Sequence, residues 1–239
     1  LEEAYEISSA TNAFPEVCGR VCPQDRLCEG NCVVEKAGFG SITIGSLEKH
    51  ITETAWNNGW IKPITSDKNQ NQKVAIIGSG PAGLAAATYL IEYGYEVEVF
   101  EKNDRIGGLM IYGIPNFKLD KSVVIRRSDW LKESGVIFHT NCEVGKDLSF
   151  EDLEKKFDAI LISTGVYKAR SLDLNTEKVS NSIPALEYLI ESNKVGLGDK
   201  PSLNSHLSAK NKKVIVIGGG DTAMDCVRTA VRQEASEVI

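Results

Sequence analysis

The apolar positions in residues 1–60 recur every three or four residues. This spacing places the apolar side chains on one face of a helix. The N-terminal part of the chain is therefore predicted to be mostly helical and poor in strands. The positions that carry this pattern are Leu1, Ala4 and Ile7, and later Ile44, Leu47, Ile51 and Ala55.

After a wholly polar segment at residues 65–73, which predicts a linker or domain boundary, the pattern changes to short apolar runs followed by glycine. The sequence "VAIIGSGPAGLAAATYLIEYGYEVEVF" predicts a strand at Val74–Ile77, a helix from Ala82 to Tyr93 and a second strand at Glu96–Phe100. A later run, "FDAILISTG" at 157–165, predicts a further buried strand.

The same succession of strand, glycine turn and helix returns at residues 212–233, "KKVIVIGGGDTAMDCVRTAVRQ", and "SEVI" then begins another strand. Residues 170–211 are polar and loop-rich, with a short helix expected around Ala185–Ile190. The repeat indicates an internal duplication. The predicted fold class is α/β, with two Rossmann-like dinucleotide-binding modules preceded by a helical domain. The expected divisions are residues 1–68, 69–169 and 170–239.

Composition narrows the function classes. The chain has 239 residues, 42% hydrophobic and 25% charged, with a net charge of −6, which provides no basic surface for nucleic acid. No apolar run approaches the roughly 18 residues of a membrane span. No secretion signal is present, so we expect a reducing, cytoplasmic setting. The chain begins without methionine and both ends resemble cuts through a longer protein, so a fragment is expected.

The first glycine turn has the spacing of a dinucleotide-binding motif. Gly78 allows a tight turn, Gly80 lets the backbone approach a pyrophosphate, and Gly83 lets helix and strand pack closely. The helix N-terminus offers free N–H groups and a positive dipole to the phosphates. An acidic residue, Glu101, ends the second strand, where it can accept hydrogen bonds from ribose hydroxyls and would repel a 2′-phosphate. This site is therefore predicted to bind FAD or NAD(H), and the glycine pair in "RIGGLM" (105–110) favours FAD.

The second glycine turn, "VIVIGGGDTAMD", has Gly218 and Gly220 with Ala223 in the third position, which often accompanies nicotinamide sites. Asp221 and Thr222 begin the helix. They are expected to act either as N-cap residues or as contacts to a ligand. The residue that would decide between NADH and NADPH is expected beyond Ile239.

Cys18, Cys22, Cys28 and Cys32 are separated by gaps of three, five and three residues. If the segment is helical, gaps of three place Cys18 and Cys22 one helical turn apart, and likewise Cys28 and Cys32. The run lacks the C-x₂-C pairs typical of zinc sites, and a disulfide framework conflicts with a reducing compartment. The spacing favours a [4Fe–4S] cluster, with zinc and structural thiols as the alternatives.

The remaining reactive side chains suggest no catalytic site. Cys142 and Cys226 are expected to be buried small apolar residues. His50, His139 and His206 are scattered, and no nucleophile–base arrangement is present. Hydrolytic chemistry therefore has no support.

Several segments together resemble the small (β) subunit family of bacterial NADPH-dependent glutamate synthases. They are "PEVCGRVCPQDRLCEGNC", "TIGSLEKHITETAW", "VAIIGSGPAGLAAA", "GGLMIYGIPNFKLDKSVV", "STGVYKAR" and "VIVIGGGDTAMDCVRTAVRQ". They occur in unchanged order over the whole chain. Asn116–Asp120 differs from the E-F-R-L-P or Q-F-R-L-P of related ferredoxin:NADP oxidoreductases and dihydropyrimidine dehydrogenase, the alternative assignment.

The resemblance implies that NADPH reduces FAD and that single electrons pass through [4Fe–4S] clusters to a large (α) subunit, which forms glutamate from 2-oxoglutarate and glutamine. It implies no catalytic acid or base in this chain. The implied FAD contacts are Gly78, Ser79, Gly80, Pro81, Ala82, Gly83, Glu101, Lys102, Gly108, Leu109, Lys118 and Val144. The implied NADPH contacts are Gly218, Gly219, Gly220, Asp221 and Thr222.

In this family the helical domain holds two clusters, and an earlier cysteine run supplies about half of the ligands. The resemblance implies that Cys22 and Cys28 serve one cluster and Cys32 the other, with Cys18 a weaker candidate. Glu48 occupies the position of an unusual glutamine ligand in a relative and is a candidate ligand or a surface carboxylate. A non-catalytic scaffold is the competing class, and the intact glycine motifs argue against it.

Overall fold

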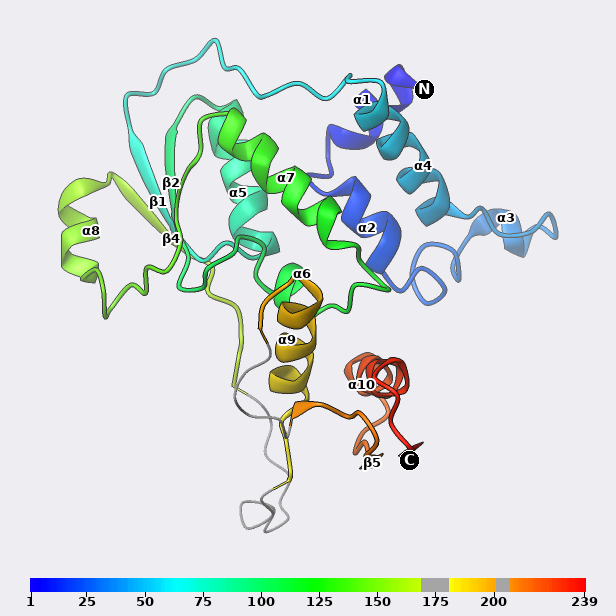
Figure 1. Ribbon diagram of the computed structural model, residues 1–239. Helices are drawn as coiled ribbons and strands as arrows, with labels where there is room; N and C mark the ends of the chain where they lie inside the picture. Colours follow the sequence, from blue (N-terminus) through cyan, green and yellow to red (C-terminus); the bar gives the residue numbers. More distant parts are fainter. Residues whose placement is uncertain (169–180, 201–206) are drawn as a thin grey trace.

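The computed structural model describes residues 1–168, 181–200 and 207–239 (Figure 1). The helices are α1 (Glu2–Ser9), α2 (Pro15–Val21), α3 (Val33–Lys36), α4 (Ile44–Asn57), α5 (Pro81–Glu92), α6 (Leu109–Tyr112), α7 (Lys121–Glu133), α8 (Phe150–Lys156), α9 (Ala185–Gly196) and α10 (Asp221–Arg232). The strands are β1 (Lys73–Ile77), β2 (Glu96–Phe100), β3 (Ile137–His139), β4 (Ala159–Ile162), β5 (Lys213–Val214) and β6 (Glu237–Val238). None of these helices combines the length and apolar character that a membrane span requires.

A four-stranded parallel sheet in the order β3-β2-β1-β4 forms the centre of the α/β part. β1 and β2 pair over their full length, with Lys73 opposite Glu96 and Ile77 opposite Phe100. The two helices α5 and α7 lie along one face (Figure 1). Leu153 of α8 is buried against the other face, with Ala75 and Phe100. The sequence prediction of an α/β fold with strands at β1, β2 and β4 is confirmed.

The second strand–turn–helix unit is smaller than its sequence pattern suggests. β5 and β6 pair in parallel over two residues, with α10 between them in the chain. The predicted strand is observed only at Lys213–Val214, and the side chains of Ile215 and Ile217 beyond it are 71% and 66% exposed. α9 extends the short helix expected at Ala185–Ile190 to Gly196. The expected boundary at 169/170 and His206 lie outside the described residues.

Residues 1–60 contain only helices among the regular elements of the described chain, as predicted. The side of these helices that faces inward differs from the prediction, since Leu1, Ile7 and Leu47 are 62%, 69% and 49% exposed. α4 buries Ala55, a member of the predicted apolar face, together with Gly45 and Thr52. Small residues permit this contact, because a Cβ on Gly19 of α2 would lie 2.8 Å from the Gly45 carbonyl oxygen.

The polar segment predicted as a linker is attached along the α/β part. The Ser66 hydroxyl donates to the Glu92 carbonyl at 3.0 Å, and the Gln70 amide donates to the Tyr93 carbonyl at 3.0 Å. Both acceptors lie at the C-terminal end of α5, where helix carbonyls lack partners within the helix. The segment thus caps a helix while it leads into β1.

A buried ion pair joins the helical residues to the α/β residues. The Arg127 guanidinium on α7 donates to both oxygens of Glu16 on α2, at 2.6 and 2.8 Å, and the two side chains are 4% and 0% exposed. The guanidinium carbon lies 4.6 Å from the Trp130 ring centroid and 5.7 Å from that of Trp56. Aromatic faces and a bidentate carboxylate are the partners that a desolvated arginine requires.

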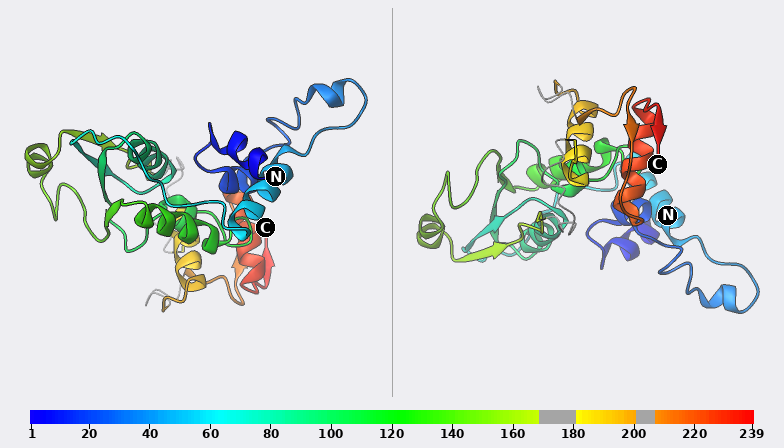
Figure 2. Two further views of the ribbon diagram at one scale, coloured as in Figure 1. Left: turned by 90° about the horizontal axis from the view of Figure 1, so that it is seen from above. Right: turned by 90° about the horizontal axis from the view of Figure 1, so that it is seen from below.

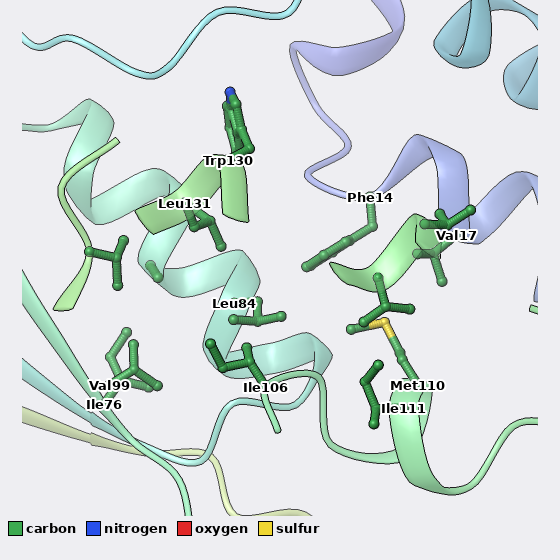
Figure 3. Packing of buried hydrophobic residues seen from close by; sticks show 14 of the residues in the cluster. Phe14, Val17, Ile76, Leu84, Val99, Ile106, Met110, Ile111, Trp130 and Leu131 are labelled. Atoms are coloured by element: carbon green, nitrogen blue, oxygen red, sulfur yellow. The ribbon is translucent and has the colours of Figure 1, made fainter. Parts of the chain in front are cut away.

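The hydrophobic core is continuous across this junction. Phe14 and Val17, at the start of α2, project toward Met110 and Ile111 of α6 (Figure 3). The same cluster continues through Leu84 on α5 to the sheet. The helical and α/β residues therefore share one core.

We expect Glu16→Gln to lower the free energy of unfolding by about 3–5 kcal/mol, because the substitution leaves the buried Arg127 charge without a counter-ion. Urea denaturation measures the change. The matched control is Asp129→Asn, which removes the carboxylate of an exposed ion pair with Lys132 and should change stability by less than about 1 kcal/mol. Equal stability losses in the two variants would contradict the assignment.

Candidate functional site

The first glycine turn joins β1 to α5 at the carboxyl edge of the sheet. Gly78 has a φ of 105°, which favours glycine, and a Cβ on Gly83 would lie 2.1 Å from the Gly78 carbonyl oxygen. A Cβ on Gly80, in contrast, would meet no atom within 4 Å. The two outer glycines thus serve the turn and the packing of the helix, while the middle one borders open space.

That open space lies at the N-terminus of α5. Gly80 is the N-cap, and Pro81 and Ala82 of the first turn are exposed. A helix of 12 residues directs free N–H groups and a positive dipole outward at this end. A pyrophosphate fits this space and this charge.

Ser79 connects the turn to the end of β2 and to the second glycine pair. The fully buried Ser79 hydroxyl donates to Glu101 Oε2 at 2.6 Å, and its backbone N–H donates to the same oxygen at 3.0 Å. The Gly107 N–H donates to the Ser79 carbonyl at 3.1 Å. These contacts bring the "RIGGLM" segment against the turn, where a Cβ on Gly108 would lie 2.7 Å from the Gly80 Cα.

Glu101 is more occupied than the sequence suggests. Its second oxygen, Oε1, accepts from the backbone N–H and the side-chain amide of Asn103, at 2.9 and 2.7 Å. With Ser79 this makes four hydrogen bonds to a carboxylate that is 5% exposed. Any ribose hydroxyl would have to replace one of these donors. Sequence reasoning missed Asn103, whose only signal is a polar side chain shortly after a strand end.

The other predicted contacts of the first site lie around this edge. Lys102 is exposed and its ammonium lies 4.6 Å from the Tyr167 ring centroid. Leu109 is exposed at the first position of α6. Val144 is half-buried and packs against the cluster of Ala75, Phe100, Leu153 and Phe157, on the face of the sheet that α8 covers.

Lys118 contacts the second module. Its ammonium lies 3.0 Å from Oδ2 of Asp225 on α10, and the side chains are 28% and 9% exposed. Sequence reasoning assigned Lys118 to FAD and did not identify Asp225. The signal that was available is the position of Asp225 one turn after Asp221 on the same helix.

Lys121 holds the short helix α6 beside the first site. Its ammonium donates to the Met110 carbonyl at 2.9 Å and to the Ile114 carbonyl, and the residue is 5% exposed. No carboxylate among the described residues contacts the Lys121 ammonium. Burial lowers the pKa of Lys121 to about 8, and the negative charge of Asp120 acts in the opposite direction.

The second glycine turn also borders open space. Gly218 has a φ of 137°, and a Cβ on Gly219 or Gly220 would meet no atom within 4 Å. Gly220 is the N-cap of α10, and Asp221 and Thr222 are exposed in its first turn. This end of α10 therefore has the free backbone and helix dipole that a phosphate requires.

The cysteines lie in different environments. Cys18 is on α2 and half-buried, Cys22 is exposed at the C-cap, and Cys28 and Cys32 lie in the segment that projects away from the body around α3 (Figure 2). Residues 24–31 form turns, so the helical spacing expected for Cys28 and Cys32 is wrong. Pro23 follows the end of α2, and proline rarely continues a helix.

Within the described residues, no three histidine, cysteine or acidic side chains are grouped closely enough to bind a metal ion. Backbone N–H donors around Cys32, first that of Ile42, lower the pKa of its thiol, as suits a thiolate ligand. Burial raises the pKa of Cys18 to about 11. Glu48 accepts a hydrogen bond from the Asn12 amide at 2.7 Å, and burial raises its pKa. The environments of Cys32, Cys18 and Glu48 therefore differ, and their assignment as cluster ligands stays a prediction.

Cys226 is buried, as predicted, and Cys142 is half-buried. His139 stacks on Phe100 with a centroid distance of 4.6 Å and lies 2.7 Å from a Glu98 oxygen.

Comparison with known families agrees with this geometry. Residues 72–239 match the model for pyridine nucleotide-disulphide oxidoreductases, and residues 1–60 match the model for dihydropyrimidine dehydrogenase domain II, 4Fe–4S cluster. The chain belongs to the pyridine nucleotide-disulphide oxidoreductase family. The order of a 4Fe–4S domain followed by this fold agrees with the sequence prediction.

Among curated proteins, the chain is 57% identical to the glutamate synthase [NADPH] small chain of Azospirillum brasilense, over 100% of this chain and 50% of the relative. It is 45% identical to the small chain of Escherichia coli K12, over 99% of this chain and 50% of the relative. It is also 44% identical to the putative oxidoreductase UacF of the same organism, over 99% of this chain and 37% of the relative. The chain thus spans about half the length of the glutamate synthase small chains it matches.

Among solved structures, FprA of Mycobacterium tuberculosis in complex with NADPH matches with a TM-score of 0.55 at 23% identity, over 66% of this chain and 36% of FprA. A 2-naphthoyl-CoA reductase matches with a TM-score of 0.54 at 19% identity, over 86% of this chain and 28% of the reductase chain. These likenesses support the fold alone.

The low pKa of Lys121 gives a pH test. The folded protein releases this proton near pH 8 and the unfolded chain near pH 10.5, so the unfolded state binds more protons between these values. Relative to Lys121→Met, the wild-type free energy of unfolding should therefore rise from pH 8 to pH 10.5, by about 3 kcal/mol at most. Urea denaturation across this range measures it. Lys132→Met, on the exposed face of α7, is the control, and the wild type should show no such rise relative to it. If the difference in unfolding free energy between wild type and Lys121→Met did not change with pH, the burial of the ammonium would be refuted.

Proposed function

We propose that the chain is the electron-input part of an NADPH-dependent glutamate synthase of the cytoplasm. The observation that carries the proposal is the 57% identity to a glutamate synthase [NADPH] small chain over the full chain. The proposed partner is the large subunit, which forms glutamate from glutamine and 2-oxoglutarate. The cysteines of the described residues are all free, which agrees with a reducing compartment.

The first glycine turn would hold FAD, with Gly80 and the α5 N-terminus at its pyrophosphate and Glu101 toward a ribose. The second turn would hold NADPH at Gly219, Gly220 and the α10 N-terminus. FAD, when bound, converts the hydride of NADPH into single electrons, and [4Fe–4S] clusters carry them onward. Hydride transfer requires aligned reactants more than an acid or base, so the chain contributes orientation.

The shared hydrophobic core supports the proposed order of electron transfer, from NADPH through FAD to the clusters. Val17 and the half-buried Cys18 lie on α2, which packs on Met110 and Ile111 of α6. α6 directly follows Gly107 and Gly108 at the first site. The cysteine segment and the proposed flavin site are therefore both attached to one packed unit.

The protein purified from its complete gene should contain FAD whose visible absorbance is bleached by NADPH under anaerobic conditions. It should also contain roughly eight irons per chain, the content of two [4Fe–4S] clusters. Gly80→Val, which places a side chain in the open space of the turn, should lose most of the bound flavin with little change in circular dichroism. Gly196→Val, at an exposed position of α9 where a Cβ would meet no atom within 4 Å, controls for a substitution at glycine.

Co-expression with a large amidotransferase subunit should then give NADPH-dependent formation of glutamate. A protein that reduces ferredoxin but never associates with such a subunit would instead be a stand-alone ferredoxin-type oxidoreductase. A protein purified without flavin would exclude both functions.

A further inference from the structure

The second glycine pair lies against the first glycine turn through backbone contacts. A Cβ on Gly108 would lie 2.7 Å from the Gly80 Cα and 3.3 Å from the Gly80 backbone nitrogen. The Gly107 N–H donates to the Ser79 carbonyl at 3.1 Å and to the Ser79 hydroxyl at 3.2 Å. Because Gly80 borders the open space at the N-terminus of α5, the position of Gly108 beside it helps to define the shape of that space.

The Tyr112 hydroxyl closes the segment that carries this glycine pair. It accepts from the Arg105 backbone N–H at 3.0 Å and donates to the Asp104 carboxylate. The Tyr112 N–H donates to the Gly108 carbonyl at 3.0 Å. Tyr112 is 2% exposed, and burial, followed by the hydrogen bond to Asp104, raises the pKa of its hydroxyl. The hydroxyl therefore keeps the proton that it donates to Asp104.

Helix α9, which lies beside α6, holds the same segment from outside the turn (Figure 1). The amide of the buried Asn193 donates to the Tyr112 carbonyl at 2.8 Å. The Arg105 guanidinium donates to both oxygens of Asp199, at 2.9 Å for Oδ2, and lies 2.7 Å from Asp104. The side chains of Arg105 and Asp199 are 26% and 32% exposed. A bidentate pair of this kind fixes orientation as well as distance.

Helix α9 is in turn attached to the end of α10. The Gln233 side chain accepts from the Tyr188 hydroxyl at 3.0 Å and donates to the Ser192 hydroxyl at 3.2 Å. A single exposed ion pair would contribute little to positioning. The pair between Arg105 and Asp199 is half-buried and bidentate, and it acts together with the buried hydrogen bond to Tyr112, so the segment has a fixed support.

We propose that Tyr112 and Asp199 are positioning residues for the nucleotide bound at the first glycine turn. They hold the second glycine pair against this turn, so that the space at the α5 N-terminus keeps the shape that a pyrophosphate requires. A binding site loses affinity when the contacts that support its walls are loosened. The inference rests on the proposed function, in which this nucleotide is FAD. It adds that the affinity of the first site depends on contacts with α9, far from the turn in sequence.

The test measures the dissociation constant of FAD, from its fluorescence change on binding, for the protein from the complete gene after removal of flavin. Tyr112→Phe and Asp199→Asn should each weaken FAD binding about tenfold, comparable to the loss of an outer-shell partner at a metal site. The affinity for NADP⁺, measured by calorimetry, should stay unchanged, because the Gln233 contacts between α9 and α10 remain.

Two matched controls remove the same groups elsewhere. Tyr93→Phe lies at the opposite end of α5, where Tyr93 is 56% exposed, and Asp129→Asn lies in the exposed ion pair with Lys132. Neither should change the affinity for FAD. If Tyr112→Phe and Asp199→Asn bound FAD as tightly as these controls, the positioning role would be overturned. Equal losses of FAD and NADP⁺ affinity would also overturn it, because they would reflect general damage to the fold.

A second readout needs no flavin. In the FAD-free protein, the backbone N–H groups of residues 107–114 should exchange with deuterium faster in Tyr112→Phe and Asp199→Asn than in the wild type. Unchanged exchange in both variants would overturn the claim that these side chains hold the segment. If the wild-type protein binds no FAD, the proposed function fails, and the exchange experiment still decides whether α9 supports the glycine pair.

Discussion

The buried ion pair between Glu16 and Arg127 joins parts of the chain that are separated by the polar segment before β1. Both charges are removed from water and each is the main partner of the other, with aromatic rings around the guanidinium. Because neither charge is tolerated alone at this depth, α2 and α7 have one favourable relative position. The shared hydrophobic core forms around that position. The placement of the cysteine segment relative to the glycine turns follows from it.

The glycine turns show a similar division between structure and open space. At the first turn, Gly78 and Gly83 are required by the fold, whereas Gly80 borders a space that no side chain fills. Ser79 and Glu101 fix the second glycine pair against this space through buried hydrogen bonds. The site is therefore formed by backbone and by fixed dipoles, which suits the binding and orientation of a nucleotide more than acid–base chemistry.

Periodicity and glycine spacing were sufficient to predict β1, β2, β4, α5, α10 and the two turns, because each of these has a local sequence pattern; β3, with only three residues, was not predicted. They failed for Leu1 and Ile7 on α1 and for Leu47 on α4, which are exposed, and they did not predict the close approach of α2 to Gly45 of α4. They also failed for Cys28 and Cys32, which lie among turns. The contacts of Asp225 and Lys121 could not be identified from sequence alone, since Asp225 pairs with a residue distant in the chain and Lys121 donates to backbone carbonyls. No pattern of local spacing contains such contacts.

The central claim is that electrons from NADPH leave the flavin site through clusters bound by the cysteine segment on the same packed unit. Electron paramagnetic resonance of the protein from the complete gene, frozen after anaerobic addition of NADPH, tests it most directly. The account predicts the signal of a reduced [4Fe–4S] cluster, diminished when Cys32 is replaced by Ser while the flavin is still bleached. Full reduction of the flavin with no cluster signal at any NADPH concentration would contradict it.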